Sequence, residues 1–129
     1  MMPQIRHIAI HTREPEQLAQ FYVDVFGMTV HQSYPSTEES ERAVFLTDGY
    51  MEVALIYDAR EDRQGIDHFG FTLAPKEKPD VYEKLAKYGI KPRKRPADRP
   101  YAEDRLADIQ GNKIDLTTTG LRLMLADNR

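Results

Sequence analysis

Turn glycines and strand histidines recur along the chain at a spacing of about sixty residues, and this repeat restricts its possible folds more than any other feature. Three landmarks hold nearly the same offset, which indicates a duplicated supersecondary unit. The alternative is coincidence among common turn residues. The landmarks are His7 and His68, 61 positions apart, and the glycine pairs Gly27/Gly89 and Gly49/Gly111, each 62 positions apart.

Each half reads as a strand, a helix and three further strands. Alternating apolar residues mark the strands, and apolar residues at helical spacing mark the helices. We therefore predict a βαβββ unit that occurs twice. The first half has a strand at 5–12, a helix at 15–26 and strands at 28–33, 43–47 and 51–57. The second half has a strand at 67–73, a helix at 79–88 and strands at 90–94, 103–108 and 113–117.

Both predicted helices carry matching end signals. Each begins with a proline, at Pro15 and Pro79, and each ends at a glycine, at Gly27 and Gly89. Proline suits the first turn and glycine suits the residue after the last turn. The predicted apolar stripes are Leu18, Phe21, Tyr22 and Val25 in one helix, and Val81, Tyr82, Leu85 and Tyr88 in the other.

Length and composition suggest one soluble domain. We expect a single domain over residues 1–129, with repeat one at about 4–58, repeat two at about 66–118 and a C-terminal tail at 119–129. The net charge of −3 gives no reason to expect nucleic acid or a membrane as partner. No cysteine is present, so any metal ligands are nitrogen or oxygen. No apolar run approaches the ~20 residues of a membrane span, and a cytoplasmic location is expected.

Three polar residues interrupt strands that otherwise read as buried. His7, His68 and Asp115 alternate with apolar neighbours, so they point to the face opposite the core. Two imidazoles and one carboxylate that converge would hold a divalent metal and leave coordination positions open. A carboxylate buried between imidazoles is costly unless a cation pairs with it. The alternative is a metal-free polar cleft with a His–Asp ion pair.

Three further residues are candidates for catalysis. His11 shares a strand face with His7 and is either a base beside the metal site or a partly exposed strand-end histidine. Arg105 lies ten residues before Asp115 and is either a donor fork for an anionic substrate group or part of a solvated charge run. Tyr101, two residues before the same predicted strand, is the third candidate.

Four stretches of this pattern resemble the vicinal oxygen chelate superfamily, and the resemblance covers about residues 4–118. That superfamily includes glyoxalase I, extradiol dioxygenases, fosfomycin-resistance enzymes, methylmalonyl-CoA epimerase and bleomycin-resistance proteins. Its last motif usually carries glutamate where this chain has Asp115. The stretches are residues 5–10, residues 18–22 running into 26–28, residues 65–71 and residues 108–116.

The resemblance implies an α+β fold in which paired βαβββ modules form a U-shaped mixed sheet around a metal-binding cleft. His7, His68 and Asp115 match the ligands on the first, fifth and eighth strands of the family. The 61-residue offset maps Asp115 onto Ala54, so the second acid of four-ligand members is missing at that position. Glu52, two residues away on the same face, is a possible additional ligand. In extradiol dioxygenases a hydrogen-bonding tyrosine occupies a place comparable to that of Arg105, so the resemblance makes Tyr101 a candidate phenol donor. The implied cofactor is a divalent ion: iron, manganese, zinc or nickel.

Three functions follow as expectations. The three-ligand set favours a metal-dependent enzyme with a dioxygenase-like site, acting on a small oxygen-chelating substrate. The alternatives are a glyoxalase-type lyase or isomerase, and a metal-free protein that binds a small molecule such as a drug. We also expect a homodimer, in which the apolar stretch at 121–125 covers an edge or a partner chain. Each triad then lies either within one chain or across two swapped chains.

Overall fold

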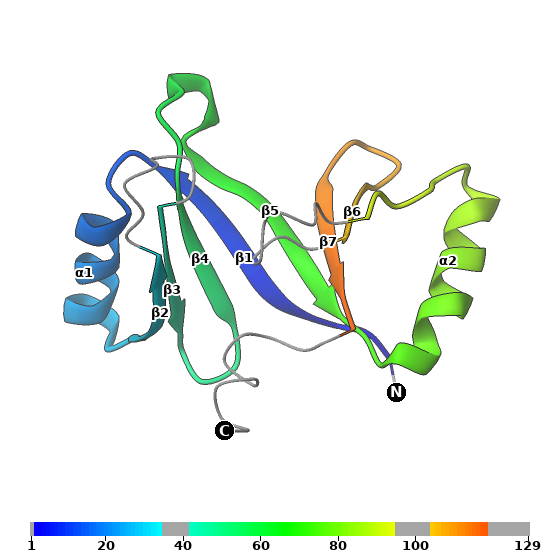
Figure 1. Ribbon diagram of the computed structural model, residues 1–129, viewed down its shortest axis with the longest axis horizontal. Coiled ribbons are helices and arrows are strands. Elements are labelled where there is room, and N and C mark those ends of the chain that lie inside the picture. The colour runs from blue at the N-terminus through cyan, green and yellow to red at the C-terminus, as the bar shows by residue number, and fades with distance from the viewer. Residues whose placement is uncertain (1, 35–41, 95–103, 119–129) are drawn as a thin grey trace. The chain divides into compact units, whose positions relative to one another are not determined.

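A computed structural model describes residues 2–34, 42–94 and 104–118 of the chain (Figure 1). These residues divide into two compact units. The N-terminal unit contains residues 7–67, and the C-terminal unit contains residues 2–6 and 68–118. Among the described helices, none is long and apolar enough to cross a membrane.

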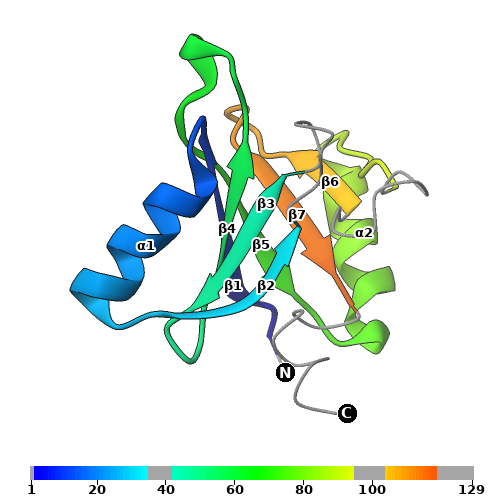
Figure 2. The same cartoon turned by 60° about the vertical axis from the view of Figure 1, so that its left-hand side comes forward.

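The N-terminal unit is a four-stranded mixed sheet with one helix on it (Figure 2). The strand order is β2-β3-β4-β1, in which β1 and β4 are parallel and the other neighbours are antiparallel. The bounds of the five predicted elements differ from the observed ones by at most one residue at either end. They are β1 (Gln4–Thr12), α1 (Pro15–Phe26), β2 (Thr29–Tyr34), β3 (Ala43–Thr47) and β4 (Glu52–Tyr57), followed by a 3-10 turn, η2 (Glu61–Arg63).

Helix α1 begins and ends where its sequence signals predict. Pro15 occupies the first turn, and Gly27 adopts φ 69°, a left-handed conformation that lets its N–H reach the carbonyls of Tyr22 and Val23. The predicted apolar stripe was partly wrong, because Phe21 and Val25 are exposed. The helix face that contacts the sheet is rotated relative to the predicted stripe and packs on a core of Val44, Leu46 and Leu55. This face consists of Leu18, Ala19, Tyr22 and Val23.

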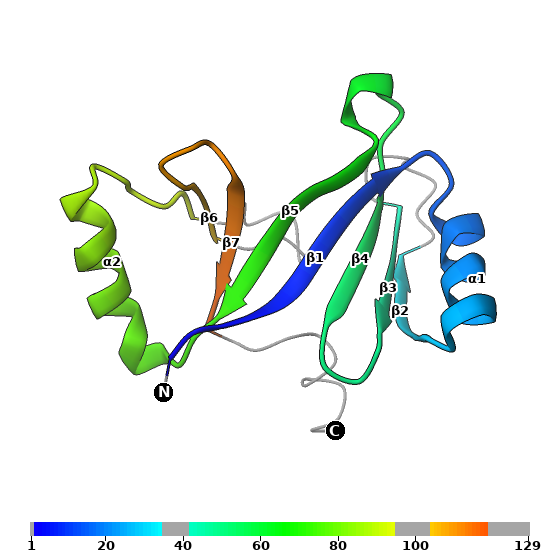
Figure 3. The ribbon, with the colours of Figure 1, turned by 180° about the vertical axis from the view of Figure 1, so that it is seen from behind.

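The C-terminal unit has a three-stranded sheet and one helix, α2, which lies beside β6 and β7 (Figure 3). The strand order is β5-β7-β6, with β5 parallel and β6 antiparallel to β7. The apolar side of α2 faces a core of Leu73, Leu106, Ile114 and Leu116. The elements are β5 (Gly65–Thr72), a 3-10 turn η3 (Pro75–Glu77), α2 (Lys78–Lys87), β6 (Asp104–Ala107) and β7 (Lys113–Thr117).

The strand predicted at 90–94 does not form within the described residues. Only one bridge remains there, in which Arg93 and Arg105 exchange two backbone hydrogen bonds of 2.7 and 2.8 Å. Alternation of residues does not specify which strand a segment pairs with, so this pattern predicted a strand where the described residues form a single bridge to β6. Asp115, predicted on an eighth strand, therefore lies on the seventh strand described.

The strand register confirms the repeat. In the N-terminal unit Ala9 lies opposite Ala54, and in the C-terminal unit Gly70 lies opposite Asp115. Both pairs belong to parallel ladders, and each residue of the second pair lies 61 positions after its counterpart. The α+β class and the paired modules are thus confirmed, with the second module one strand shorter in its described part.

Candidate metal centre

The C-terminal unit brings two of the three predicted ligands together. His68 on β5 and Asp115 on β7 are both buried, and 2.9 Å separates His68 Nε2 from Asp115 Oδ2. In the parallel β5–β7 ladder Gly70 lies opposite Asp115, so His68 lies on the adjacent strand two residues before the partner of Asp115. This buried histidine and carboxylate, in hydrogen-bond contact, are two of the three predicted ligands.

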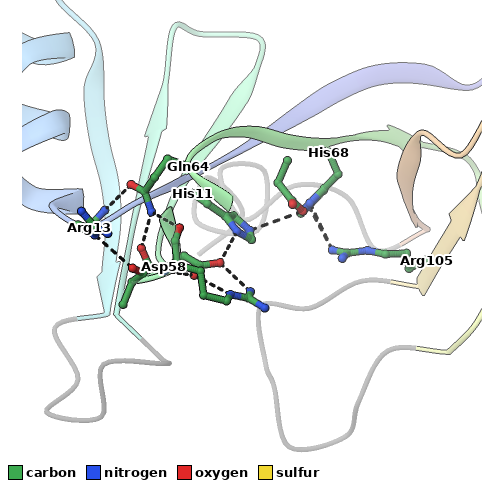
Figure 4. A network of polar contacts seen from close by, with 9 residues as sticks. His11, Arg13, Asp58, Gln64, His68 and Arg105 are labelled. Atoms are coloured by element: carbon green, nitrogen blue, oxygen red, sulfur yellow. Dashed lines mark hydrogen bonds and ion pairs between the residues drawn. The ribbon is translucent and has the colours of Figure 1, made fainter. Parts of the chain in front are cut away.

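Arg105 on β6 completes this cluster. Its Nε donates to Asp115 Oδ1 at 2.7 Å, and its Nη2 lies 3.4 Å from Asp115 Oδ2. The guanidinium also reaches the imidazole of His68, as Figure 4 shows. The solvated charge run considered for Arg105 is therefore wrong. Arg105 and Asp115 face each other directly across the antiparallel β6–β7 pair, which the ten-residue spacing could have suggested.

These contacts set the charge of Asp115. Burial alone raises the pKa of this carboxyl, but the hydrogen bonds from His68 and Arg105 and their charges outweigh burial, so its pKa is lowered. Asp115 is consequently an anion at neutral pH, which is the form that binds a metal.

The His68–Asp115 pair fits a divalent ion. Donors at about 2.0–2.2 Å from a divalent ion lie roughly 3 Å apart at the right angle of octahedral geometry and roughly 3.4 Å apart at zinc's tetrahedral angle. The observed 2.9 Å is close to the octahedral spacing, and a tetrahedral ion would need the two donors to move slightly apart. Arg105 lies closest to Oδ1 of Asp115, whereas Oδ2 faces the imidazole.

His7, the third predicted ligand, lies in the N-terminal unit and contacts Glu52. His7 and Glu52 lie opposite each other in the β1–β4 ladder, and 3.0 Å separates His7 Nδ1 from Glu52 Oε1. His31 on β2 is the second histidine at this carboxylate, with Nε2 at 3.7 Å from Oε2. Glu52 is buried, and so is Ala54 at the position that the repeat assigns to a second acid.

His11 is held by an acid that the sequence reasoning missed. Its Nδ1 lies 2.9 Å from Asp58 Oδ2, and its Nε2 lies 3.6 Å from Asp67 Oδ2 (Figure 4). Asp58 directly follows β4, and its N–H donates to the carbonyl of Thr12 at the matching end of β1. The parallel pairing of β1 and β4 was the signal that could have found it.

Asp58 itself is fixed by a basic partner. Arg60 donates through Nε to Oδ1 at 2.9 Å and through Nη2 to Oδ2 at 2.7 Å. The side chain of Gln64 donates to the carbonyl of Asp58 at 2.7 Å and accepts from the N–H of Arg13. His11 is thus an oriented imidazole rather than a loosely exposed one.

Two predicted features lie outside the described residues. These are Tyr101, the candidate phenol donor, and the apolar stretch at 121–125. Both stay predictions.

Three similar solved structures share the fold of this chain at low sequence identity. A hypothetical protein from Bacillus halodurans C-125 has a TM-score of 0.69 at 15% identity, over 90% of this chain and 94% of that one. Methylmalonyl-CoA epimerase from Mycobacterium tuberculosis has a TM-score of 0.68 at 17% identity, over 94% and 91%. The epimerase of Streptomyces coelicolor in complex with 2-nitronate-propionyl-CoA has a TM-score of 0.65 at 20% identity, over 90% and 94%.

No curated protein matches the chain. A family model does: that of the Glyoxalase/Bleomycin resistance protein/Dioxygenase superfamily matches residues 4–116, which is most of the sequence. This chain belongs to the Glyoxalase/Bleomycin resistance protein/Dioxygenase superfamily.

Proposed function

We propose that this protein is a divalent-metal-dependent enzyme that acts on a small substrate chelated through two oxygens. The ligands are His7, His68 and Asp115. The observation that carries the proposal is the buried His68–Asp115 pair, whose donor atoms lie 2.9 Å apart. Superfamily membership over residues 4–116 supports the same assignment.

Glu52 is the partner of His7 in this proposal, not a ligand. A carboxylate that accepts from one imidazole nitrogen fixes the tautomer and directs the other nitrogen to the metal. The 3.0 Å contact at Nδ1 fits this role. Ligation by His7 then occurs through Nε2.

For the reaction class we propose proton transfer next to a carbonyl, as in a lyase or isomerase. A bound divalent ion would polarise the substrate oxygens as a Lewis acid. His11 moves the proton, and Asp58 holds its ring in one orientation through the 2.9 Å contact at Nδ1. The methylmalonyl-CoA epimerases among the similar structures support this choice over oxygenase chemistry.

A dioxygenase is the second candidate. Ala54 stands where four-ligand members carry a second acid, and three protein ligands leave positions open for substrate and dioxygen. Iron in the purified protein, together with activity on catechols, would favour this reading. A protein without metal in any preparation would favour the ligand-binding alternative.

The ligand assignment is tested by the metal content of purified variants. His68→Ala is expected to abolish stoichiometric metal binding while the fold survives, because it removes a ligand and leaves Asp115 paired with Arg105. His11→Ala is the matched control, since it removes a strand histidine outside the ligand set. Glu52→Gln is expected to keep most of the metal. Unchanged metal in His68→Ala would refute the site, and loss of metal in Glu52→Gln would make Glu52 a fourth ligand.

The reaction class is tested by deuterium exchange. Acyl-CoA esters and glutathione adducts with an acidic C–H next to a carbonyl are incubated with the metal-loaded protein in D2O. Wild-type protein is expected to exchange this hydrogen, and His11→Ala is expected to lose most of the exchange rate while it retains metal. Equal exchange rates in both proteins would exclude His11 as the proton-transferring group.

A further inference from the structure

We propose that Arg105 is a built-in counter-ion that competes with the divalent cation for Asp115 and thereby sets the affinity of the site for metal. The inference rests on the proposed function, because it concerns the same ligand. In this proposal β6 supplies a cation, the Arg105 guanidinium, that pairs with the Asp115 carboxylate when no metal is bound.

The contacts of Arg105 are those of a cation that replaces a metal. Its Nε and Nη2 lie 2.7 and 3.4 Å from the two oxygens of Asp115. The same Nη2 lies 3.4 Å from His68 Nδ1 and 3.3 Å from His68 Nε2. One guanidinium therefore contacts both ligands that the C-terminal unit offers.

Burial explains why such a counter-ion is needed. Asp115 is 4% exposed and His68 is 5% exposed, so an unpaired carboxylate at this place would be costly. The guanidinium of Arg105 pairs with Asp115, and the side chain of Arg105 is 33% exposed. Because that side chain reaches solvent, it can leave the carboxylate without becoming buried elsewhere.

Repulsion between like charges determines whether Arg105 raises or lowers the affinity of the site for metal. A divalent ion at His68 and Asp115 would lie within a few ångströms of the guanidinium, and like charges repel strongly at this distance in a partly buried site. The ion must also displace the N–H···O contact between His68 and Asp115. Arg105 thus lowers the affinity for metal, although it stabilises the metal-free protein.

The opposite role is that Arg105 supports the metal by holding Asp115 in place. Outer partners of metal ligands often act in this way, and their loss weakens metal binding. The two roles predict changes of opposite sign in the metal dissociation constant when the charge is removed. One substitution therefore distinguishes them.

The test compares Arg105→Met, Arg105→Lys and Lys78→Met with the wild-type protein. Methionine keeps most of the side-chain volume without the charge, whereas lysine keeps the charge. Lys78→Met is the matched control, because Lys78 lies 3.5 Å from Asp104, an acid on the same strand as Arg105, and not at the proposed site. Mn²⁺ and Zn²⁺ dissociation constants are measured by calorimetry at fixed pH and ionic strength.

Arg105→Met is expected to bind both ions about tenfold more tightly or better, since one repelling charge is removed. Arg105→Lys and Lys78→Met are expected to stay within about threefold of wild type. In EDTA, Arg105→Met should melt at a lower temperature than wild type, and Mn²⁺ should raise its melting temperature more than it raises that of wild type.

Each other result overturns the proposal in a recognisable way. Weaker or equal metal binding by Arg105→Met, with wild type binding normally, overturns the competition and leaves the proposed function intact. Absence of binding in wild type and in all variants overturns both. An unchanged melting temperature of Arg105→Met in EDTA shows that Arg105 is not the counter-ion of Asp115.

Discussion

Asp58 shows at the scale of one residue how a short segment can organise a candidate catalytic histidine. Its carboxylate accepts from the Arg60 side chain, from the Arg60 backbone N–H and from His11. The Arg60 side chain lowers the pKa of Asp58 most, burial opposes this, and the Arg60 backbone N–H and His11 lower the pKa further. The result is a pKa well below the ordinary range for aspartate.

This lowered pKa makes stability depend on acidity. The unfolded carboxyl titrates near 3.9, so the contribution of Asp58 is fully present above about pH 5 and is lost as pH falls towards the folded-state pKa. We predict that Asp58→Asn lowers the unfolding free energy at pH 7 by about 1 kcal/mol, a small value because solvent partly screens the charge of Arg60. The substitution also makes the decline of the unfolding free energy between about pH 5 and pH 2 shallower, because it removes the titrating carboxyl.

Urea unfolding of both proteins over this pH range measures the difference. Asp80→Asn is the control, since Asp80 forms an exposed pair with Lys84 on α2. Parallel pH profiles for wild type and Asp58→Asn would contradict the prediction.

The two helices differ at the scale of the element. Helix α1 buries Pro15 and Ala19 against its sheet, whereas α2 buries none of its residues. An apolar pocket of about 170 Å³, open to solvent on one side, lies between α2 and its sheet. The C-terminal unit is therefore less tightly packed than the N-terminal one. The pocket is lined by Pro3, Phe71, Leu73, Val81, Leu85, Leu106, Ile114 and Leu116.

Filling this pocket should stabilise the protein. We predict that Val81→Leu raises the unfolding free energy by about 0.5–1 kcal/mol, because it adds apolar volume and favours the helix. Enlarging the tightly packed Ala19 to valine should instead lower it by about 1–3 kcal/mol. Urea unfolding at pH 7 gives both values, and a loss of stability in Val81→Leu would show that the pocket cannot accept the added group.

At the scale of the whole molecule, one face of α1 suggests association. Phe21, Val25 and Phe26 are 51, 57 and 68% exposed. Phe21 makes an edge contact with Phe26, so the two rings form a contiguous apolar surface. Such surfaces mark contact sites in many soluble proteins. Together with the apolar stretch at 121–125, this surface favours the homodimer expected from the family.

We predict a dimer at micromolar concentration, weakened by Phe21→Ser combined with Phe26→Ser. Tyr88→Ser, at an exposed aromatic residue after α2, is the control. Light scattering measures the mass, and a monomeric wild-type protein would refute the dimer.

Mixing His7→Ala with His68→Ala subunits tests a swap, since partial metal binding returns only if one site draws its ligands from two chains.

Sequence alone determined the elements whose signals are local. The bounds of α1 follow from Pro15 and Gly27, and those of β3 and β7 follow from short apolar runs between turns. The repeat could also be recognised from the sequence, because turn glycines and strand histidines recur at nearly the same offset. The sequence also predicted the candidate ligands, because each is a polar residue within an apolar strand of the repeat. They are His7, His68 and Asp115.

Tertiary structure decided what each of these residues contacts. Asp58 meets His11 across 47 positions, and Arg105 meets both Asp115 and His68. Such contacts depend on strand register and on the ends of strands that lie far apart in the chain, which alternation of apolar residues does not specify. The strand predicted at 90–94 failed for a related reason: its residue pattern does not specify a ladder partner, and among the described residues it meets β6 through the single bridge between Arg93 and Arg105.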